Sequence, residues 1–208
     1  MRFPPIVGER MLQPMATAPD DSELMLQFRE GDLPAFEALY TRHKGPLYRY
    51  LLRHCGDREA AGDLFQEVWG KIIKSRGDYQ PLAKFTTYLY HIAHNCLVDY
   101  YRYHGRRHRS EHVEYEDRLP ADEIAAPREP ERLAASAQLA QKLEQALASL
   151  PDTQREAFLL REEGGLSLEE IGRATGVGRE TVKSRLRYAV AKLRSVLAAE
   201  YVTMTGTQ

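Results

Sequence analysis

Residues 179–194 combine polar and cationic side chains at a spacing that could bind nucleic acid. If this segment is a helix that advances about 100° per residue, its apolar side carries Val182, Leu186, Ala189, Val190 and Leu193, and Glu180, Thr181, Ser184 and Tyr188 lie opposite. Cations occupy both flanks, with Arg179, Lys183 and Arg187 on one and Arg185 and Lys192 on the other. A polar crest between cationic flanks suits the major groove of DNA, because the crest reaches base edges while the flanks contact phosphates.

A short helix and a turn precede this segment and complete a helix-turn-helix pattern. Ser167 can cap the first helix, which has Leu168 and Ile171 on its apolar side. The turn is Thr175-Gly176-Val177, where glycine tolerates a positive φ, and the second helix begins near Gly178. The pattern predicts binding to duplex DNA. A solvated basic helix is the alternative, since short motifs of this kind also occur without that role.

A second polar stripe lies on a predicted helix that is capped by Asp57 and ends near Lys74. Its members, at helical spacing, are Asp63, Gln66, Glu67 and Gly70, apart from an apolar stripe of Ala61, Leu64, Phe65, Val68 and Ile72. We expect Trp69 to be exposed beside the polar stripe. An aromatic residue next to acidic and amide groups suits docking on a basic protein surface, because aromatic anchors are enriched at interfaces. The alternative is a solvated helix face.

The next predicted helix, from about Ala83 to His104, combines aromatic, amide and cationic residues. One flanking stripe carries Tyr88, Asn95, Asp99 and Arg102, while Tyr90 and Tyr101 lie near the far face and Phe85, Leu89, Ile92, Cys96 and Tyr103 share the core side. A cationic cluster of Arg106, Arg107 and Arg109 follows. Rings can stack on unpaired bases, Asn can read a base edge and Arg can hold phosphates, so the helix suits unstacked nucleic acid. The alternative is an ordinary bundle with amphipathic tyrosines at its surface.

No set of residues in the sequence predicts catalysis, a metal site or a cofactor. His104, His108 and His112 have i, i+4, i+8 spacing, but no thiolate accompanies them, so we expect no metal. Two cysteines without a CxxC motif, Cys55 and Cys96, fit small buried side chains in a reducing compartment. The glutamates at 162–163 and 169–170 read as solvent-facing helix charges.

The net charge of −1, with 28% charged residues, gives no argument by itself for a nucleic-acid partner. The charges are, however, unevenly distributed along the chain. Residues 91–109 hold four Arg against one Asp, residues 110–131 hold eight acidic residues against two Arg, and residues 179–194 hold six basic residues against one acidic. No apolar run is long enough to span a bilayer and no signal-peptide core appears, so we expect a cytoplasmic protein without membrane insertion.

The pattern of helix caps and breakers predicts an all-α fold of two small helical domains joined by a flexible acidic linker, the C-terminal one a helix-turn-helix. Residues 1–19 are predicted to be a disordered extension, with Met11 and Met15 as alternative start positions. The first domain covers residues 20–104, the linker residues 105–131, the second domain residues 132–200 and a tail residues 201–208.

The two halves together resemble the extracytoplasmic-function (ECF) class of bacterial sigma factors, from about Asp21 to Leu197. The first half contains DREAAGDLFQEVWGKI and FTTYLYHIAHNCLVDYYRYHGRR, which resemble the core-binding and −10-recognition segments of the class. The second half contains Val177, Thr181, Val182, Lys183, Ser184, Arg185 and Leu186 in a V-x-x-x-T-V-K-S-R-L pattern that resembles the −35-reading domain. The class often has Trp at the position of Tyr88, and Arg at those of His91 and His94.

The resemblance implies a role for each group of residues. Polymerase core binding, to the β′ clamp helices and the β subunit, falls to Asp63, Gln66, Glu67, Val68 and Trp69. Recognition and melting of the −10 element falls to Asp78, Tyr79 and Gln80 of the loop at 77–82, and to Tyr88, Asn95, Asp99, Arg102, Arg106 and Arg107. Binding to the −35 element falls to Arg179, Glu180, Thr181, Lys183, Ser184, Arg185, Arg187 and Lys192.

The resemblance further implies promoter DNA and an anti-sigma factor as partners, with no enzymatic activity, cofactor or small-molecule substrate. The competing hypothesis is a helix-turn-helix repressor or activator whose N-terminal bundle senses a signal or dimerises. That hypothesis explains the C-terminal half and leaves the stripes of the first half unexplained.

Overall fold

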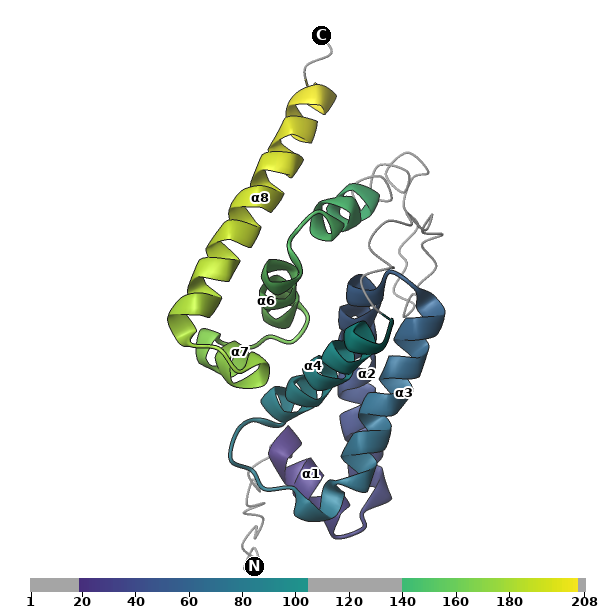
Figure 1. Cartoon of the computed structure of the whole chain (residues 1–208). Coiled ribbons are helices and arrows are strands. Elements are labelled where there is room, and N and C mark those ends of the chain that lie inside the picture. Colours follow the sequence, from purple (N-terminus) through teal and green to yellow (C-terminus); the bar gives the residue numbers. More distant parts are fainter. Residues whose placement is uncertain (1–18, 105–139, 206–208) are drawn as a thin grey trace, which may run out of the picture.

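The computed structural model describes residues 19–104 and 140–205, and every regular element in these two ranges is a helix (Figure 1). The helices are α1 (Asp21–Arg29), α2 (Leu33–Cys55), α3 (Arg58–Lys74), the 3₁₀ turn η1 (Arg76–Asp78), α4 (Phe85–His104), a helix over 140–148, α6 (Asp152–Glu162), α7 (Leu168–Thr175) and α8 (Arg179–Thr205). The predicted all-α fold is confirmed. The N-terminal extension up to residue 18, the acidic linker and the first residues of the second predicted domain, 132–139, lie outside the described residues.

Aspartates start the first three helices, as the sequence indicates. Asp20, Asp32 and Asp57 each accept a hydrogen bond from a backbone N–H in the first turn of α1, α2 and α3. Such caps satisfy donors that a helix leaves unpaired at its N-terminus. Gly56 ends α2 with a φ of 69°, a left-handed conformation that a residue with a Cβ would adopt only at a cost. These signals set where the helices of the N-terminal half begin and end. In the folded chain, α1 packs on α2, α2 on α3 and α3 on α4.

The C-terminal half is the predicted helix-turn-helix with α6 packed against it. Ser167 and Glu170 form a reciprocal cap at the start of α7, and Gly176 ends α7 with a φ of 70°. The apolar side of α8 packs inward as expected, with Val182, Ala189 and Leu193 buried. The helix continues to Thr205, past the residue at which a tail was expected. None of the helices in the described ranges combines the length and the apolar character needed to cross a bilayer.

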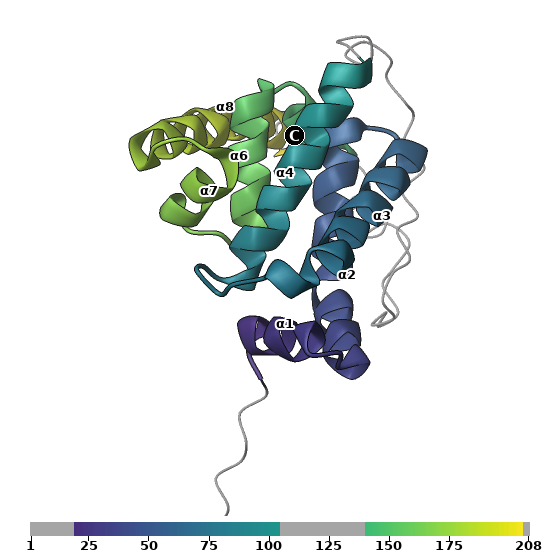
Figure 2. The ribbon, with the colours of Figure 1, turned by 60° about the horizontal axis from the view of Figure 1, so that its bottom comes forward.

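The two halves pack directly against each other instead of lying apart. In Figure 2, α6 lies beside α4, and α7 lies next to α6. The contacts between α4 and α7 and between α2 and α6 join the halves. One cluster of buried residues runs through both halves, from Leu24 in α1 to Leu193 in α8. Apolar burial is the main favourable term in folding, so this shared core holds the halves together in the structure.

Candidate nucleic-acid and protein interfaces

The polar stripe on α3 is exposed where the sequence predicts it. Asp63, Gln66 and Glu67 are all exposed, and Glu67 forms an ion pair with Lys71 one turn further on, at 2.8 Å. This hydrogen-bonded carboxylate raises the pKa of Lys71 above its ordinary value. The stripe therefore presents two carboxylates and an amide to the outside on a helix whose opposite side is buried.

The expectation of an exposed Trp69 is wrong. Its side chain is only 4% exposed, and its ring packs against the rings of Phe36, Tyr40 and Phe65. Val68, also assigned to core binding, is fully buried. Trp69 was expected to be exposed because it lies next to the polar stripe, but the aromatic side chains of α2 extend the core over it. Both residues support the stripe from inside the fold.

The stripe borders an acidic groove between α3 and the C-terminal end of α4. Its volume is about 510 Å³, and its acidic lining consists of Asp57, Glu59, Asp63, Glu67 and Asp99. Tyr100 and Tyr103 of α4 also line the groove. An acidic groove with aromatic walls is complementary to a cationic partner surface.

The polar stripe on α4 is also exposed over most of its length. Asn95, Asp99 and Arg102 are exposed, and Asp99 lies 3.4 Å from Arg102 in an ion pair. Tyr88 is half-buried, and its hydroxyl is 2.7 Å from the hydroxyl of Ser75. The structure thus places the amide, the carboxylate and the guanidinium on one accessible face, next to a tyrosine held by the end of α3.

The loop before α4 presents only two of its three assigned residues. Asp78 and Gln80 are exposed, but Tyr79 is 3% exposed and its ring packs edge-on against Tyr88, with centroids 5.2 Å apart. Burial raises the pKa of the Tyr79 hydroxyl. Tyr79 therefore fixes the loop on the bundle and is not accessible to a base in this structure.

Among three other tyrosines of α4, Tyr90 and Tyr103 differ from the helical-wheel expectation, while Tyr101, expected near the far face, is exposed. Tyr90, expected near the far face, is 1% exposed because the C-terminal half covers that side of α4. Tyr101 is partly exposed and its hydroxyl donates to the backbone carbonyl of His54 at 2.8 Å. Tyr103, expected on the core side, is 87% exposed.

His91 connects the C-terminal half to Asn95. Its Nδ1 is 3.0 Å from the carbonyl oxygen of Ala174 in α7, and its Nε2 is 3.2 Å from the amide nitrogen of Asn95. Because a carbonyl oxygen can only accept, Nδ1 carries the proton and the neutral ring accepts at Nε2 from the Asn95 amide. His91 therefore links the side chain of Asn95 to the backbone of α7.

The crest and flanks of α8 are accessible for the most part. Exposed side chains are Arg179, Glu180, Thr181, Lys183, Arg187, Tyr188 and Lys192. Ser184 and Arg185 are half-buried, and Arg185 lies near the hydrogen-bonded pair of His94 and Glu156 at the contact between the halves. Arg185 thus lies on the side of α8 that faces α4 and α6.

Several candidate residues lie outside the described ranges. They are Arg106 and Arg107 of the assigned −10 group, and Arg109, His108 and His112 beyond it. Among the residues that the structure describes, no three His, Cys, Asp or Glu side chains gather as metal ligands would.

The sequence-based interpretation missed the ionic contact between the halves. Glu163, expected to face solvent, accepts from Arg49 Nε at 2.8 Å and also pairs with Arg53. Glu170, also expected to face solvent, is buried, and lies 3.1 Å from the ammonium of Lys84. The side chain of Glu156 lies 2.5 Å from His94 Nδ1. No local pattern could show these contacts, because Arg49 and Glu163 are 114 residues apart in the chain.

Comparison with known proteins agrees with this arrangement. Residues 39–107 match the model for Sigma-70 region 2, and residues 146–195 match the model for Sigma-70 region 4. These two regions, in this order and on these helices, define the sigma-70 architecture. The polar stripes of α3 and α4 lie in the first match, and the helix-turn-helix lies in the second.

Relatives in several bacteria show to which class of sigma factors the chain belongs. The chain is 35% identical over 166 residues to the ECF sigma factor SigE of Mycolicibacterium smegmatis, covering 80% of this chain and 63% of that protein. It is 34% identical to the sigma factor CarQ of Myxococcus xanthus, covering 83% of this chain and 95% of CarQ. It is 30% identical to the sigma-H factor of Pseudomonas aeruginosa, covering 89% of this chain and all of that factor. The chain therefore belongs to the ECF class of sigma factors, whose members give RNA polymerase its promoter specificity.

Solved structures share the fold. CnrH, solved in complex with the cytosolic domain of CnrY, matches with a TM-score of 0.63 at 24% identity, over 86% of this chain and 97% of CnrH. The sigma factor RpoE of Bartonella quintana, solved with the anti-sigma factor NepR, matches with a TM-score of 0.63 at 22% identity, over 80% of this chain and 98% of RpoE. The match of both halves to one family leaves the repressor or activator hypothesis without support.

Proposed function

We propose that the chain binds the RNA polymerase core through α3 and reads a promoter at two points, with α4 and its preceding loop at the −10 element and α8 at the −35 element. One observation carries the proposal. The residues assigned to the three roles lie mostly exposed on three different helices of one scaffold. A sigma factor must engage three surfaces at once, which this distribution permits.

Core binding rests on the acidic surface of α3. Asp63 and Glu67 line the acidic groove between α3 and α4, and Gln66 is exposed on the same helix. A cationic surface of the β′ clamp helices or of the β subunit is the complementary partner. Charge complementarity of this kind speeds association and suppresses wrong partners. Trp69 and Val68 contribute by holding α3 in place.

Recognition of the −10 element rests on an exposed amide and a guanidinium on α4. Asn95 can read the edge of an unpaired base, and Arg102 can hold a phosphate. Asp78 and Gln80 of the loop are exposed and would contact a flipped base, and the packing of Tyr79 on Tyr88 supports the loop. The factor does no covalent chemistry in this role, because trapping unstacked bases is enough to favour melting.

Recognition of the −35 element rests on α8. Glu180, Thr181 and Ser184 form the crest that reaches base edges, and the cations on its flanks contact phosphates. Phosphate contacts make the affinity salt-dependent, while the crest supplies selectivity.

An anti-sigma protein is the proposed regulatory partner, and the cytoplasm, where RNA polymerase works, is the proposed location. The two solved structures above are factors of the same fold in complexes, one of them with a named anti-sigma factor. An anti-sigma partner would restrict access to the polymerase- or promoter-binding surfaces.

Replacement of Glu67 by lysine tests the core-binding role. Glu67→Lys places a cation against a cationic partner, so we expect affinity for purified core polymerase to fall about a hundredfold or more. Binding to an isolated −35 duplex should stay unchanged, because α8 lies in the other half of the chain. Fluorescence titration with labelled factor measures both affinities, and run-off transcription measures initiation.

Glu37→Lys is the matched control, because Glu37 is exposed on α2 and has no assigned role. It makes the same change of charge on the same half and should bind core normally. Equal loss of core binding and −35 binding in Glu67→Lys would contradict this division of roles. No initiation by the unmodified chain on any fragment of its own genome would overturn the proposed function.

A further inference from the structure

The loop before α4 ends in a leucine that lies almost entirely in solvent. Leu82 is 85% exposed, more than any other large aliphatic side chain among the described residues. A single exposed leucine is ordinary on a protein surface, so its exposure alone indicates no function. Leu82 differs from an ordinary surface leucine because a rigid loop carries it, at one end of the proposed −10 reader.

The first part of this loop is anchored to α1 and α4. The ring of Tyr79 is buried against the ring of Tyr88, with centroids 5.2 Å apart. The guanidinium of Arg29 in α1 donates to the carbonyl oxygen of Tyr79 at 3.3 Å. The guanidinium of Arg76 also lies 5.4 Å from the centre of the Phe28 ring. Both the side chain and the backbone of the loop are therefore held by the bundle.

A tight turn fixes the end of the loop. The N–H of Leu82 donates to the carbonyl oxygen of Gln80 at 2.8 Å, which closes a three-residue turn with Pro81 at its centre. The proline ring fixes one of the two backbone dihedral angles at this position, so the turn has few alternative conformations. The turn thus keeps the Leu82 side chain exposed and prevents it from folding back onto the bundle.

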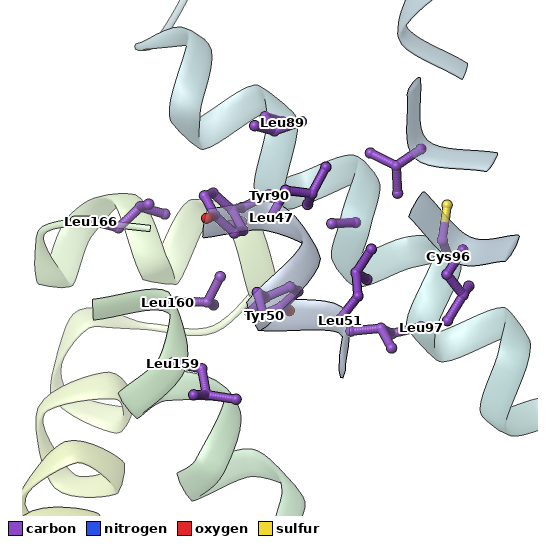
Figure 3. Packing of buried hydrophobic residues seen from close by; sticks show 14 of the residues in the cluster. Leu47, Tyr50, Leu51, Leu89, Tyr90, Cys96, Leu97, Leu159, Leu160 and Leu166 are labelled. Atoms are coloured by element: carbon purple, nitrogen blue, oxygen red, sulfur yellow. The ribbon is translucent and has the colours of Figure 1, made fainter. Parts of the chain in front are cut away.

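The helix behind the loop is held by the core. Phe85, the first residue of α4, is 1% exposed. Leu89 and Tyr90 of α4 belong to the same cluster of buried side chains as Leu47 of α2 (Figure 3). Packed interiors of this kind deform little, so a load on the loop is carried by the whole N-terminal half.

Leu82 lies at one end of the residues assigned to the −10 element. It comes three residues before Phe85, whereas Asn95 and Arg102 lie further along α4. A helix rises about 1.5 Å per residue, so Asn95 lies about 15 Å beyond Phe85 along the axis. Successive bases of one strand of duplex DNA are about 3.4 Å apart, so Leu82 lies several base steps from the base that Asn95 would read.

An apolar side chain in this place suits the opening of a duplex. Proteins that kink or open DNA often insert a leucine or a similar residue between two base steps, where it contacts the faces of bases that have lost their stacking partner. The exposed side chains of the loop are Asp78, Gln80, Pro81 and Leu82. Among them only Leu82 is a long apolar chain, while Asp78 and Gln80 can hydrogen-bond to base edges.

We propose that Leu82 is a wedge that enters the base stack at the edge of the −10 element, while Asn95 and the loop hold the unstacked bases. This inference rests on the proposed function and names the residue that separates opening of the duplex from its recognition. A residue with this role is needed when the promoter must be melted, and is not needed when the strands are already apart.

Initiation on two forms of one template tests the proposal. Core polymerase with the full-length factor is given a fragment of the factor's own genome, either as duplex or with the −10 segment held open by a mismatched strand. The measured quantity is the ratio of the initiation rate on the duplex to that on the open template. Leu82→Ala should lower this ratio about tenfold or more, because the lost stacking is no longer replaced. Permanganate oxidation of unpaired thymines on the duplex should fall with it.

Two further variants separate the wedge from other effects of the substitution. Leu82→Met keeps a long apolar side chain and should restore the ratio to within about twofold of the unmodified chain. Leu33→Ala makes the same truncation at another leucine of the same half, which is 69% exposed, and should leave the ratio unchanged. Because Leu82 is not packed in the core, Leu82→Ala should also leave the Tm of the free factor unchanged.

Three results would overturn the proposal. One is a ratio in Leu82→Ala equal to that of the unmodified chain. Another is an equal loss on both templates, which would mean a role in folding or in binding. The third is a ratio that falls as far in Leu33→Ala or in Leu82→Met as in Leu82→Ala.

Failure of the wedge is distinguishable from failure of the proposed function. An unmodified chain that initiates on both templates, with an unchanged ratio in Leu82→Ala, removes the wedge and keeps the sigma-factor role. An unmodified chain that initiates on neither form of any genomic fragment removes both.

Discussion

Two buried side chains give the exposed stripe on α3 its position. Val68 and Trp69 lie beneath Asp63, Gln66 and Glu67, and the Trp69 ring contacts three aromatic rings of α2 and α3. Aromatic pairs of this kind add to the stability gained by burial alone. The position of the surface that is proposed to bind polymerase therefore depends on the packing of this aromatic cluster.

Truncation of Trp69 should act on stability first. We expect Trp69→Ala to lower the free energy of unfolding by about 3–5 kcal/mol, because it removes a large buried ring. Trp69→Phe keeps an aromatic ring and removes a buried indole N–H that has no hydrogen-bond partner among the described residues, so its cost should stay below about 1.5 kcal/mol. Urea unfolding followed by far-UV circular dichroism measures both, since Trp69 is the single tryptophan and fluorescence disappears with it.

The affinity of the folded Trp69→Phe variant for core polymerase shows whether Trp69 only supports the polar stripe or contacts the polymerase itself. A supporting residue leaves the affinity for core polymerase close to that of the unmodified chain. A large loss of affinity in a stably folded Trp69→Phe would instead mean that the indole itself reaches the polymerase.

The turn between α7 and α8 orients the proposed −35 reader. Gly176 ends α7 in a left-handed conformation, and the N–H of Val177 donates to the carbonyl oxygen of Gly172 at 3.0 Å. Gly172 lies under this turn, and a Cβ there would meet the carbonyl oxygen of Val177 at 2.7 Å. The angle between the two helices thus depends on the absence of a side chain at position 172.

Gly172→Ala should therefore destabilise the helix-turn-helix. Alanine normally favours a helix interior, but here the backbone of the turn must move, and we expect a cost of about 1–3 kcal/mol. Thermal unfolding should show a lower Tm, and affinity for a −35 duplex should fall because α8 is reoriented.

Gly62→Ala in α3 is the matched comparison. Gly62 is also a helical glycine, but a Cβ there would meet no atom within 4 Å. It should raise stability by about 0.5–1 kcal/mol through helix propensity alone. Equal effects of the two substitutions would contradict the role given to the turn.

At the scale of the whole molecule, the contact between the halves contains titratable groups that should make the packing of the two halves depend on pH. His94 faces Glu156 of α6 and Arg185 of α8, and His54 and Tyr50 of α2 lie at the same contact. The hydrogen bond to Glu156 raises the pKa of His94 above 6.5. Burial lowers the pKa of His54 to about 4. The pKa of Glu156 lies below its ordinary value because, against the effect of burial, it accepts from His94.

These directions predict a pH optimum for the packing of the two halves on each other. Protonated His94 favours this packing, so its contribution is complete below pH 6.5 and is lost as pH rises through its raised pKa. Neutral His54 also favours the packing, so its contribution is complete above pH 6.5 and is lost as pH falls towards about 4. Energy transfer between one dye on α3 and another on α8 of the full chain should therefore decrease on both sides of neutral pH.

His94→Gln isolates the alkaline side of this profile. Glutamine can still donate to Glu156 but does not titrate, so the decrease at high pH should disappear while the decrease at low pH remains. If the decrease at high pH persists unchanged in His94→Gln, a group other than His94 causes it.

The sequence by itself determined the features that depend on neighbouring residues. Caps at Asp20, Asp32, Asp57 and Ser167 fixed where helices begin, and the periodicity of α8 fixed which side is buried, because both effects act within a few residues. The exposure of Asp63, Gln66, Glu67 and Asn95 followed from the same helical period. The fold class and the outward faces of the candidate surfaces could therefore be predicted.

Only the tertiary structure decided which borderline side chains are buried and how the halves meet. Trp69, Tyr79 and Tyr90 are buried because other helices or loops cover them, and a helical wheel contains no information on those neighbours. Glu163 and Glu170 look like ordinary surface charges until the chain brings Arg49, Arg53 and Lys84 to them from the other half. Burial and ion pairing depend on distance in space. Residues that are far apart in the chain can meet in the fold, and the spacing of neighbouring residues does not predict such contacts.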